Sequence, residues 1–479
     1  MRPKLQLLDE ALIERILGEA HQLLTQSGVR VGAESVVALL QTAGVQVHEG
    51  IAHIPETLVL ACLASVPREF CLYTRQGDKA VHYGGERSHF DPGSCCVQML
   101  DPDTLEARPS TSEDLTQIVQ LTEVLPEFDA QATAVACTDQ PSEIGDLYRL
   151  YVILKNSNKP IVTGSFSAAG LHGMIDLLIA DAGGHDELKQ KPRAVFDVCP
   201  SPPLNWSEFG GLNLIDLAKA GVPAQIVSMP LAGAAAPVTL AGSITQHAAE
   251  CLAGIVIHQL ACPSAPIVWG GAPAIFDMSV GMAPMGAIET AMLNMGCAEV
   301  GKSLGLPTHG YLVATDSKLV DSQAGMESAR SAVLGALSGI DMISGAGMLD
   351  SLACFSLEKL VIDAEAIASA QRLMRGISGD TLAVAAFAEC GLSGEFLKLK
   401  ETRALFRDEQ QLPSSVIDRS SRIEGSHSDA FSRAHGRIGE VLDGYRKPEI
   451  TSATLLEFDR IMQSEANRRG VRQVSTVGF

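Results

Sequence analysis

From about residue 90, short apolar segments alternate with longer segments in which apolar residues recur at helical spacing. The short segments are typical of buried parallel strands, which are apolar on both faces. We predict strands at 95–100, 130–136, 160–166, 194–199, 224–230, 266–271, 308–313 and 342–345. Helices are expected at 112–125, 143–156, 168–182, 207–220, 238–260, 284–304, 322–338 and 355–375.

Each predicted strand is followed by one helix, and eight such units fit a (β/α)8 TIM barrel of the α/β class. Proline introduces several strands, as at Leu306-Pro307, where it ends the preceding helix without removing a ladder hydrogen bond. An open doubly wound sheet is the alternative, but it usually has fewer strands and a glycine-rich first turn. Here the first strand leads into Asp101-Pro-Asp-Thr instead. The barrel is therefore the predicted fold.

Both flanks of the predicted catalytic barrel (90–376) have a different pattern. Residues 1–89 are α-rich and end in short strand candidates at 70–74 and 81–83. Residues 377–479 contain predicted helices whose apolar faces need a partner surface. These helices are placed at 382–389, 395–407, 429–445 and 453–468. We expect helical N-terminal and C-terminal additions, the latter packed on the barrel.

Composition narrows the classes of partner. The 479 residues carry a formal net charge of −20, which argues against nucleic acid and anionic membranes as main partners. The mean hydropathy of +0.16 suits a buried parallel sheet, and no apolar run reaches the length of a membrane span. The N-terminus is typical of an amphipathic helix rather than a signal peptide, so we expect a cytoplasmic protein. The eleven cysteines lack zinc-ligand spacing, so no metal is expected.

The carboxyl ends of the strands carry the chemistry in barrel enzymes. Aromatic residues make up only 5% of the chain, yet both tryptophans follow predicted strand ends. No acid–base constellation is apparent, so no catalytic residue is assigned, and His309 is early enough in its strand to be a core residue. The candidate substrate-binding residues are Gln98, Phe166, Asp197, Trp206, Trp269, Phe276, Asp277, Tyr311, Thr315, Asp316 and Lys318.

These candidates predict a site for an N-methylated cation. Aromatic faces, above all those of Trp206 and Trp269, attract quaternary ammonium groups by about 0.5–2 kcal/mol per contact. The three aspartates would supply a countercharge, or instead cap helices and turns. Lys318 would bind a substrate carboxylate, or instead be solvated or paired with Asp316 or Asp321. For each aromatic ring the alternative is simple packing against helices.

One stretch carries a family resemblance. Thr315-Asp-Ser-Lys318 runs directly out of an apolar strand and is followed by Asp321-Ser-Gln-Ala-Gly-Met-Glu327. This succession of strand, polar turn and helix start resembles the trimethylamine methyltransferase family. Further similar stretches cover nearly the whole length, among them Asn156-Ser-Asn-Lys-Pro160, 231–240, 281–296 and Gly394-Glu-Phe-Leu.

The resemblance implies a methyltransferase that moves a methyl group from a methylamine to the cob(I)alamin of a separate corrinoid protein. The trimethylamine enzymes of methanogens carry pyrrolysine near the end of the seventh strand, whereas residues 313–315 here are ordinary ones. Pyrrolysine-lacking relatives act on quaternary amines such as glycine betaine, proline betaine and carnitine. We therefore predict a quaternary-amine methyltransferase that forms a homo-oligomer, docks a corrinoid protein and binds no cofactor tightly itself.

Three alternatives stay open. The chain could be a trimethylamine-type enzyme, a zinc-dependent corrinoid methyltransferase, or a non-catalytic betaine-binding barrel. Cysteine spacing disfavours the zinc enzyme.

Overall fold

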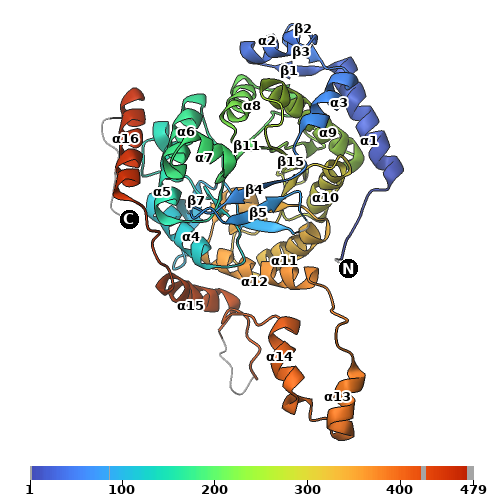
Figure 1. Cartoon of the computed structure of the whole chain (residues 1–479), viewed down its shortest axis with the longest axis vertical. Helices are drawn as coiled ribbons and strands as arrows, with labels where there is room; N and C mark the ends of the chain where they lie inside the picture. The colour runs from blue at the N-terminus through green and yellow to red at the C-terminus, as the bar shows by residue number, and fades with distance from the viewer. Residues whose placement is uncertain (1–2, 86, 422–427, 472–479) are drawn as a thin grey trace.

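The computed structural model describes residues 3–85, 87–421 and 428–471, and its centre is one curved sheet of eight parallel strands surrounded by helices (Figure 1). In spatial order the strands are β6 (His89–Pro92), β18 (Met342–Ala346), β17 (Thr308–Tyr311), β15 (Ile267–Gly271), β13 (Ala224–Ile226), β11 (Ala194–Val198), β10 (Ile161–Thr163) and β9 (Gln131–Ala132). A hydrogen bond of 2.9 Å from Asp129 N to Phe90 O brings β9 beside β6. The sheet is a nearly closed barrel, which confirms the predicted fold.

The predicted helices cover the outer face of the barrel. They are α4 (Ser112–Val124), α5 (Gly145–Asn156), α6 (Ala168–Ala182), α8 (Glu208–Ala220), α9 (Leu240–Ala261), α10 (Ile288–Ser303), α11 (Ser322–Leu337) and α12 (Leu357–Met374). Side-chain caps fix many of their starts: Thr111 and Asp321, for example, accept hydrogen bonds from backbone N–H groups of α4 and α11. A short helix that we did not predict, α7 (His185–Gln190), follows α6.

The first barrel strand is not where the apolar pattern placed it. We predicted it at 95–100, whereas β6 is His89–Pro92 and pairs with β18. The sequence His-Phe-Asp-Pro contains polar residues and a proline, a pattern more typical of a turn than of a strand. Gln98–Leu100 instead forms β7, in a small sheet with β8 (Ala107–Pro109), β19 (Met348–Leu349) and β20 (Cys354–Phe355). This sheet follows the carboxyl ends of β6 and β18.

A hairpin closes the amino-terminal end of the barrel. Strands β4 (Phe70–Tyr73) and β5 (Lys79–Tyr83) pair antiparallel, close to the predicted short strands. The side chains of Leu72, Val81 and Tyr83 pack against apolar residues at or just before the strand starts. Those residues are Ala130, Val162, Val195, Val268 and Met342. This hairpin is the plug of the barrel. Because it closes the amino-terminal end, a ligand can enter at the carboxyl ends of the strands.

The N-terminal region packs on α9. It contains α1 (Glu10–Gln22), the π-helical turn Leu23–Ser27, α2 (Glu34–Thr42), α3 (Glu56–Ser65), and the strands β1 (Val29–Val31), β2 (Gln46–His48) and β3 (Ile51–His53), which form a sheet with β12 (Asn205–Trp206). Within the described residues, α9 is the one helix long and apolar enough to cross a membrane, and 83% of its apolar window is buried inside the fold. Its contacts with α1, α3 and α8 account for that composition.

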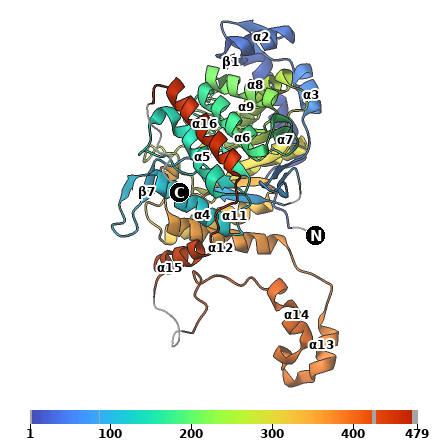
Figure 2. The same ribbon diagram turned by 60° about the vertical axis from the view of Figure 1, so that its left-hand side comes forward.

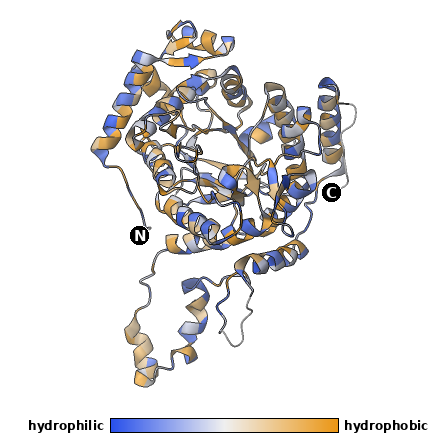
Figure 3. Cartoon of the chain, turned by 180° about the vertical axis from the view of Figure 1, so that it is seen from behind, coloured by the Kyte–Doolittle hydropathy of each residue, from blue (hydrophilic) through white to orange (hydrophobic). Residues whose placement is uncertain are grey.

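Two of the C-terminal helices pack on the barrel, and two project away from it. α15 (Ala430–Asp443) packs on α12, and α16 (Ser452–Arg468) packs on α6, as expected of a helical addition. α13 (Ala383–Cys390) and α14 (Lys400–Glu409) project away from the barrel, so the expected packing is wrong for this arm (Figures 1 and 2). No residue described in these two helices is buried, and Val384 is 83% exposed on the apolar α13 (Figure 3). The division at 89 and 376 stays a prediction, and its terminal segments include residues outside the description.

Candidate active site

Polar side chains occupy the middle of the barrel. On β11, Val195 packs against the hairpin plug, and Asp197, two residues further, points to the same side of the strand. The neighbouring strands place further polar side chains beside it, and hydrogen bonds link them into two chains. The members are Asp91, Gln225, His309 and Ser344, together with Tyr83 from the plug.

The first chain runs through Asp91. Ser344 Oγ donates a hydrogen bond of 2.6 Å to Asp91 Oδ1, and His309 Nε2 lies 3.0 Å from the same hydroxyl. Burial holds the pKa of Asp91 well above its usual range, against the lowering effect of the Ser344 hydrogen bond. Burial also lowers the pKa of His309 to about 3, so the imidazole is neutral. The core position that we expected for His309 is the one it has.

The second chain runs through Asp197. Gln225 Nε2 donates a hydrogen bond of 2.7 Å to Asp197 Oδ1, and Tyr83 Oη donates one of 3.1 Å to Gln225 Oε1. Burial raises the pKa of Asp197 to about 7. Among the described residues, neither Asp91 nor Asp197 has an ion pair with a basic side chain. The barrel interior thus holds two carboxyl groups that are not paired with any basic side chain in the described part of the chain.

Tyr311 lies above these carboxyl groups. Its hydroxyl donates a hydrogen bond of 2.6 Å to Ser94 O and accepts one of 3.0 Å from Ser94 N. Burial raises the pKa of Tyr311 well above its usual value, and the nearby carboxyls of Asp197 and Asp91 add to the shift. Ser94 Oγ in turn donates a hydrogen bond of 3.1 Å to Thr133 O, at the carboxyl end of β9. The Tyr311 ring therefore stands at the mouth of the barrel, next to both acids.

Phe166 covers another part of the mouth. It follows β10, and its ring centroid is 4.3 Å from the guanidinium carbon of Arg149 on α5. Arg149 Nη1 donates a hydrogen bond of 2.8 Å to Thr133 O, the same carbonyl that accepts from Ser94. A continuous series of contacts therefore leads from Tyr311 across the mouth to Phe166.

Residues in the Thr315–Lys318 stretch connect neighbouring loops through hydrogen bonds. Thr315 Oγ1 donates to Glu327 Oε2, and Asp316 N donates a hydrogen bond of 2.9 Å to the same oxygen. The Asp316 carboxylate accepts from Met285 N (2.7 Å), Gly286 N (3.0 Å) and Ser351 Oγ (2.8 Å). Because these partners follow β16 (Ala274–Ile275) and β19, Asp316 joins three strand-end loops. The contacts of Thr315 and Asp316 are structural.

Four further candidates occupy positions that do not join the acids. Lys318 Nζ is 3.2 Å from Asp350 Oδ1, and its side chain is 69% exposed, which matches the salt-bridged alternative with a different partner. Asp277 accepts from Ser279 N and Oγ within its own turn, and those hydrogen bonds lower its pKa. Phe276 is half-buried beside β14 (Leu231–Ala232), its N donating to Ala232 O. Gln98 begins β7.

The two tryptophans pack outside the barrel wall. Trp206 Nε1 donates to Glu250 O on α9 (3.2 Å), and Trp269 Nε1 donates to Cys297 O on α10 (2.9 Å). A Cβ at Gly254 or Gly301 on these helices would lie 2.4 or 2.6 Å from the respective indole ring. Both indoles therefore fill helix–strand gaps and are fully buried. Our placement of them around the cation is corrected accordingly: Trp269 is a barrel-strand residue that faces the helices, and Trp206 is on β12, in the sheet with β1.

The structure thus brings together Asp197, Tyr311 and Phe166, and adds Asp91, Arg149, Gln225, His309 and Ser344, which sequence reasoning missed. Asp91 was missed because the first strand was misplaced. Arg149 had a detectable signal, since it is the only charged residue between Leu147 and Leu154 on α5. An isolated charge in an apolar helix is expected to have a specific partner.

Burial raises the pKa of the Cys96 and Cys137 thiols, so they stay protonated. Within the described ranges, no group of three His, Cys, Asp or Glu side chains is arranged to hold a metal ion. The barrel interior becomes negatively charged when the carboxyl groups of Asp91 and Asp197 lose their protons.

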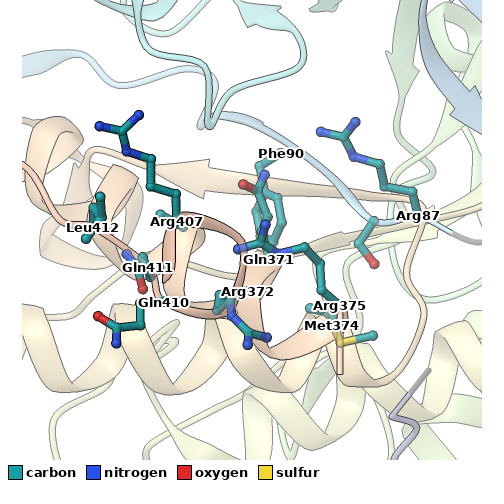
Figure 4. Close-up of a pocket in the computed structure, with 13 residues that line it drawn as sticks. Arg87, Phe90, Gln371, Arg372, Met374, Arg375, Arg407, Gln410, Gln411 and Leu412 are labelled. Atoms are coloured by element: carbon teal, nitrogen blue, oxygen red, sulfur yellow. The ribbon is translucent and has the colours of Figure 1, made fainter. Parts of the chain in front are cut away.

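A cavity of about 870 Å³ lies elsewhere, between α12 and the segment 407–412 (Figure 4). Arg87, Arg372, Arg375 and Arg407 line it, together with Phe90. Because Arg87 precedes β6 and Phe90 is near its start, this cavity is near the amino-terminal end of the strands. It is not part of the mouth described above.

Comparisons with known proteins agree with this architecture. The family model described as trimethylamine methyltransferase matches residues 1–467. A trimethylamine methyltransferase of Desulfitobacterium hafniense (strain DSM 10664 / DCB-2) is 30% identical over 91% of this chain and 89% of its own length. A glycine betaine methyltransferase of Desulfitobacterium hafniense (strain Y51) is 27% identical over 98% of both chains.

A solved structure shares the fold. The monomethylamine methyltransferase of Methanosarcina barkeri gives a TM-score of 0.55 at 12% identity, over 98% of this chain and 89% of that one. The family match covers the barrel and both additions. The chain therefore belongs to the trimethylamine methyltransferase family and is a methyltransferase.

Proposed function

We propose that this methyltransferase takes a methyl group from a quaternary amine bound at the mouth of the barrel and transfers it to the cob(I)alamin of a separate corrinoid protein. The observation that carries the proposal is the pair of carboxyls in the barrel interior: Asp91 is buried, Asp197 is half-buried, and neither has a basic partner among the described residues. A buried carboxylate is stable only when it is paired or protonated. A permanently charged ammonium group would complete this pair.

The chemistry of a quaternary amine fits the neutral surroundings. The leaving group is a neutral tertiary amine, so no general acid is required, and His309 is held neutral by burial. A quaternary nitrogen has no N–H donor, so carboxylates and aromatic faces such as that of Tyr311 stabilise it without directed hydrogen bonds. Methyl substitution further needs in-line approach in a dry site. Cob(I)alamin supplies the nucleophile when the corrinoid protein presents it at the strand-end face.

Two features favour quaternary amines over trimethylamine. Residues 313–315 are ordinary, whereas the trimethylamine branch that the sequence resembles carries pyrrolysine in this region. A relative named glycine betaine methyltransferase also aligns over 98% of the chain. Glycine betaine, proline betaine and carnitine are the substrates that we propose to test.

The homo-oligomer also stays a prediction, and sedimentation of the purified chain tests it.

The test is a methylation assay with cob(I)alamin, read by the change in its absorption spectrum. The panel contains the three betaines, tetramethylammonium and trimethylamine. We expect methylation with at least one quaternary amine and none with trimethylamine. Methylation by trimethylamine alone would support the trimethylamine-type alternative, and betaine binding without methylation would support the non-catalytic barrel. Metal analysis of active protein separates the zinc-dependent alternative.

A further inference from the structure

Arg149 is a buried cation without a countercharge. Its side chain is 1% exposed, on an α5 segment that is otherwise apolar from Leu147 to Leu154. Among the described residues its guanidinium forms no ion pair, and its one hydrogen bond goes to the carbonyl of Thr133. Its Nε is buried without an acceptor. Burying an unpaired charge is costly, so this guanidinium is suited to an anion that the protein itself does not supply.

The position of Arg149 relates it to the two acids. Thr133 Oγ1 lies 3.2 Å from Thr163 Oγ1 on β10, and Thr163 is in register with Phe196, the residue before Asp197. The Arg149 guanidinium and Asp197 are therefore attached near the ends of β9 and β11, which are separated by one strand. That separation corresponds to about 10 Å between the strand backbones. Side chains reaching inward from both sides could hold the two ends of one small molecule.

We propose that Arg149 binds the carboxylate of a zwitterionic substrate whose ammonium end is held by Asp197 and Asp91. The assignment rests on the proposed function and adds a residue that determines specificity. A guanidinium presents paired N–H donors that match a carboxylate, and its hydrogen bonds to an anion are charge-assisted. Lys318, the carboxylate ligand considered from sequence, is paired with Asp350 in solvent instead.

Phe166 forms part of this proposed carboxylate site. One face of its ring covers the Arg149 guanidinium, while the residue as a whole is 59% exposed. The ring shields the cation from water, so a carboxylate would have to displace it to reach the guanidinium. A neutral or purely cationic ligand would have no reason to displace it, because cation–π contact with Arg149 is favourable.

Calorimetric titration with three probes tests the assignment. Glycine betaine carries a carboxylate, choline carries a hydroxyl, and tetramethylammonium carries neither. Arg149→Gln is expected to weaken glycine betaine binding at least tenfold, because charge-assisted hydrogen bonds are lost, and to change the other two less than twofold. Arg149→Lys keeps the charge and is expected to give an intermediate loss. Lys318→Met is the matched control and is expected to bind all three probes like the parent.

The outcomes distinguish a failure of the Arg149 assignment from a failure of the proposed function. If the parent binds choline and tetramethylammonium but not glycine betaine, or if both Arg149 variants lose all three probes equally, the carboxylate role is overturned and the proposed function stands. If the parent binds none of the probes, the proposed function itself fails, and the assignment with it. Should Arg149→Gln not fold, Arg149→Lys alone decides: a loss confined to glycine betaine supports the role, and no loss removes it.

Discussion

Gln225 Nε2 donates a hydrogen bond of 2.7 Å to Asp197 Oδ1, so a neutral amide rather than a cation orients this carboxyl. Flipping the side-chain amide of Gln225 would break both of its hydrogen bonds, because its oxygen accepts one from the Tyr83 hydroxyl of the plug. The closed end of the barrel therefore fixes a carboxyl near the open end. Its charge is left for a ligand to neutralise.

Asp197→Asn tests that role. The substitution keeps shape and removes charge, so we expect tetramethylammonium affinity to fall at least tenfold while the melting temperature at pH 8 does not decrease. Isothermal titration and thermal unfolding measure the two effects. Asp277→Asn is the matched control, since Asp277 caps its own turn, and it should leave the affinity unchanged. Equal affinity in the Asp197 variant and the parent would remove Asp197 from the site.

Affinity should also depend on pH. The pKa of Asp197 is about 7 in the free protein, where Gln225, Asp91 and Tyr311 face it, so the carboxyl ionises as pH rises. We expect tetramethylammonium to bind more tightly at pH 8 than at pH 6, and this difference to shrink in Asp197→Asn. Titrations at several pH values measure it. A pH-independent affinity in the parent would contradict the assignment.

The same shift has a consequence for stability. Because the folded pKa of Asp197 exceeds its unfolded value near 4, the folded state binds the extra proton between these values. This carboxyl therefore contributes stability at low pH that is lost as pH rises from about 4 to 7. A saturating quaternary amine should oppose the loss. Denaturant unfolding across this pH range, with and without tetramethylammonium, and with Asp197→Asn as reference, isolates the contribution.

The tryptophans should matter for stability and not for binding. Trp206→Phe and Trp269→Phe remove indole N–H groups that donate to Glu250 O and Cys297 O inside the core. We expect each to lower the free energy of unfolding by about 1–3 kcal/mol and to change tetramethylammonium affinity less than twofold. Chemical denaturation and calorimetry report the two quantities. A large loss of affinity with unchanged stability would restore the tryptophans to the site.

Asp316 should act through the loops that it joins. Asp316→Ala removes the acceptor for Met285 N, Gly286 N and Ser351 Oγ. We expect faster hydrogen exchange at the amides of Met285 and Gly286, and a lower melting temperature, since a buried N–H without an acceptor is unfavourable. Asp321→Ala, which removes the cap of α11 and the acceptor of Ser317 Oγ but leaves the Asp316 contacts in place, is the comparison. Unchanged exchange at both amides would show that the carboxylate does not hold these loops.

Much of the fold was predictable because hydrophobic periodicity reports which faces are buried. Seven barrel strands and their helices are at the predicted places within a few residues. The first strand was not, because Asp91 and Pro92 belong to a buried strand, and one oxygen of Asp91 is hydrogen-bonded by Ser344, which is distant in sequence. The arm that contains α13 and α14 was misjudged because its apolar residues, such as Val384, are exposed instead of packed on the barrel.

The site was less predictable than the fold. Strand-end position identified Asp197, Tyr311 and Phe166, but it cannot tell whether a side chain faces the barrel interior or the helices. Trp269 and Gly270 are neighbours on β15, and the wall turns the indole outward. Arg149 is on a helix, where strand-end reasoning does not look. Its hydrogen bond to Thr133 O, just after β9, places it at the mouth.

Single-turnover methylation of cob(I)alamin tests the central claim most directly. With glycine betaine or tetramethylammonium at pH 8, the absorption change should appear in the parent protein and be at least tenfold slower in Asp197→Asn. The Asp277→Asn control should match the parent. Methylation by quaternary amines at the same rate in Asp197→Asn and the parent, or methylation by trimethylamine alone, would contradict the account.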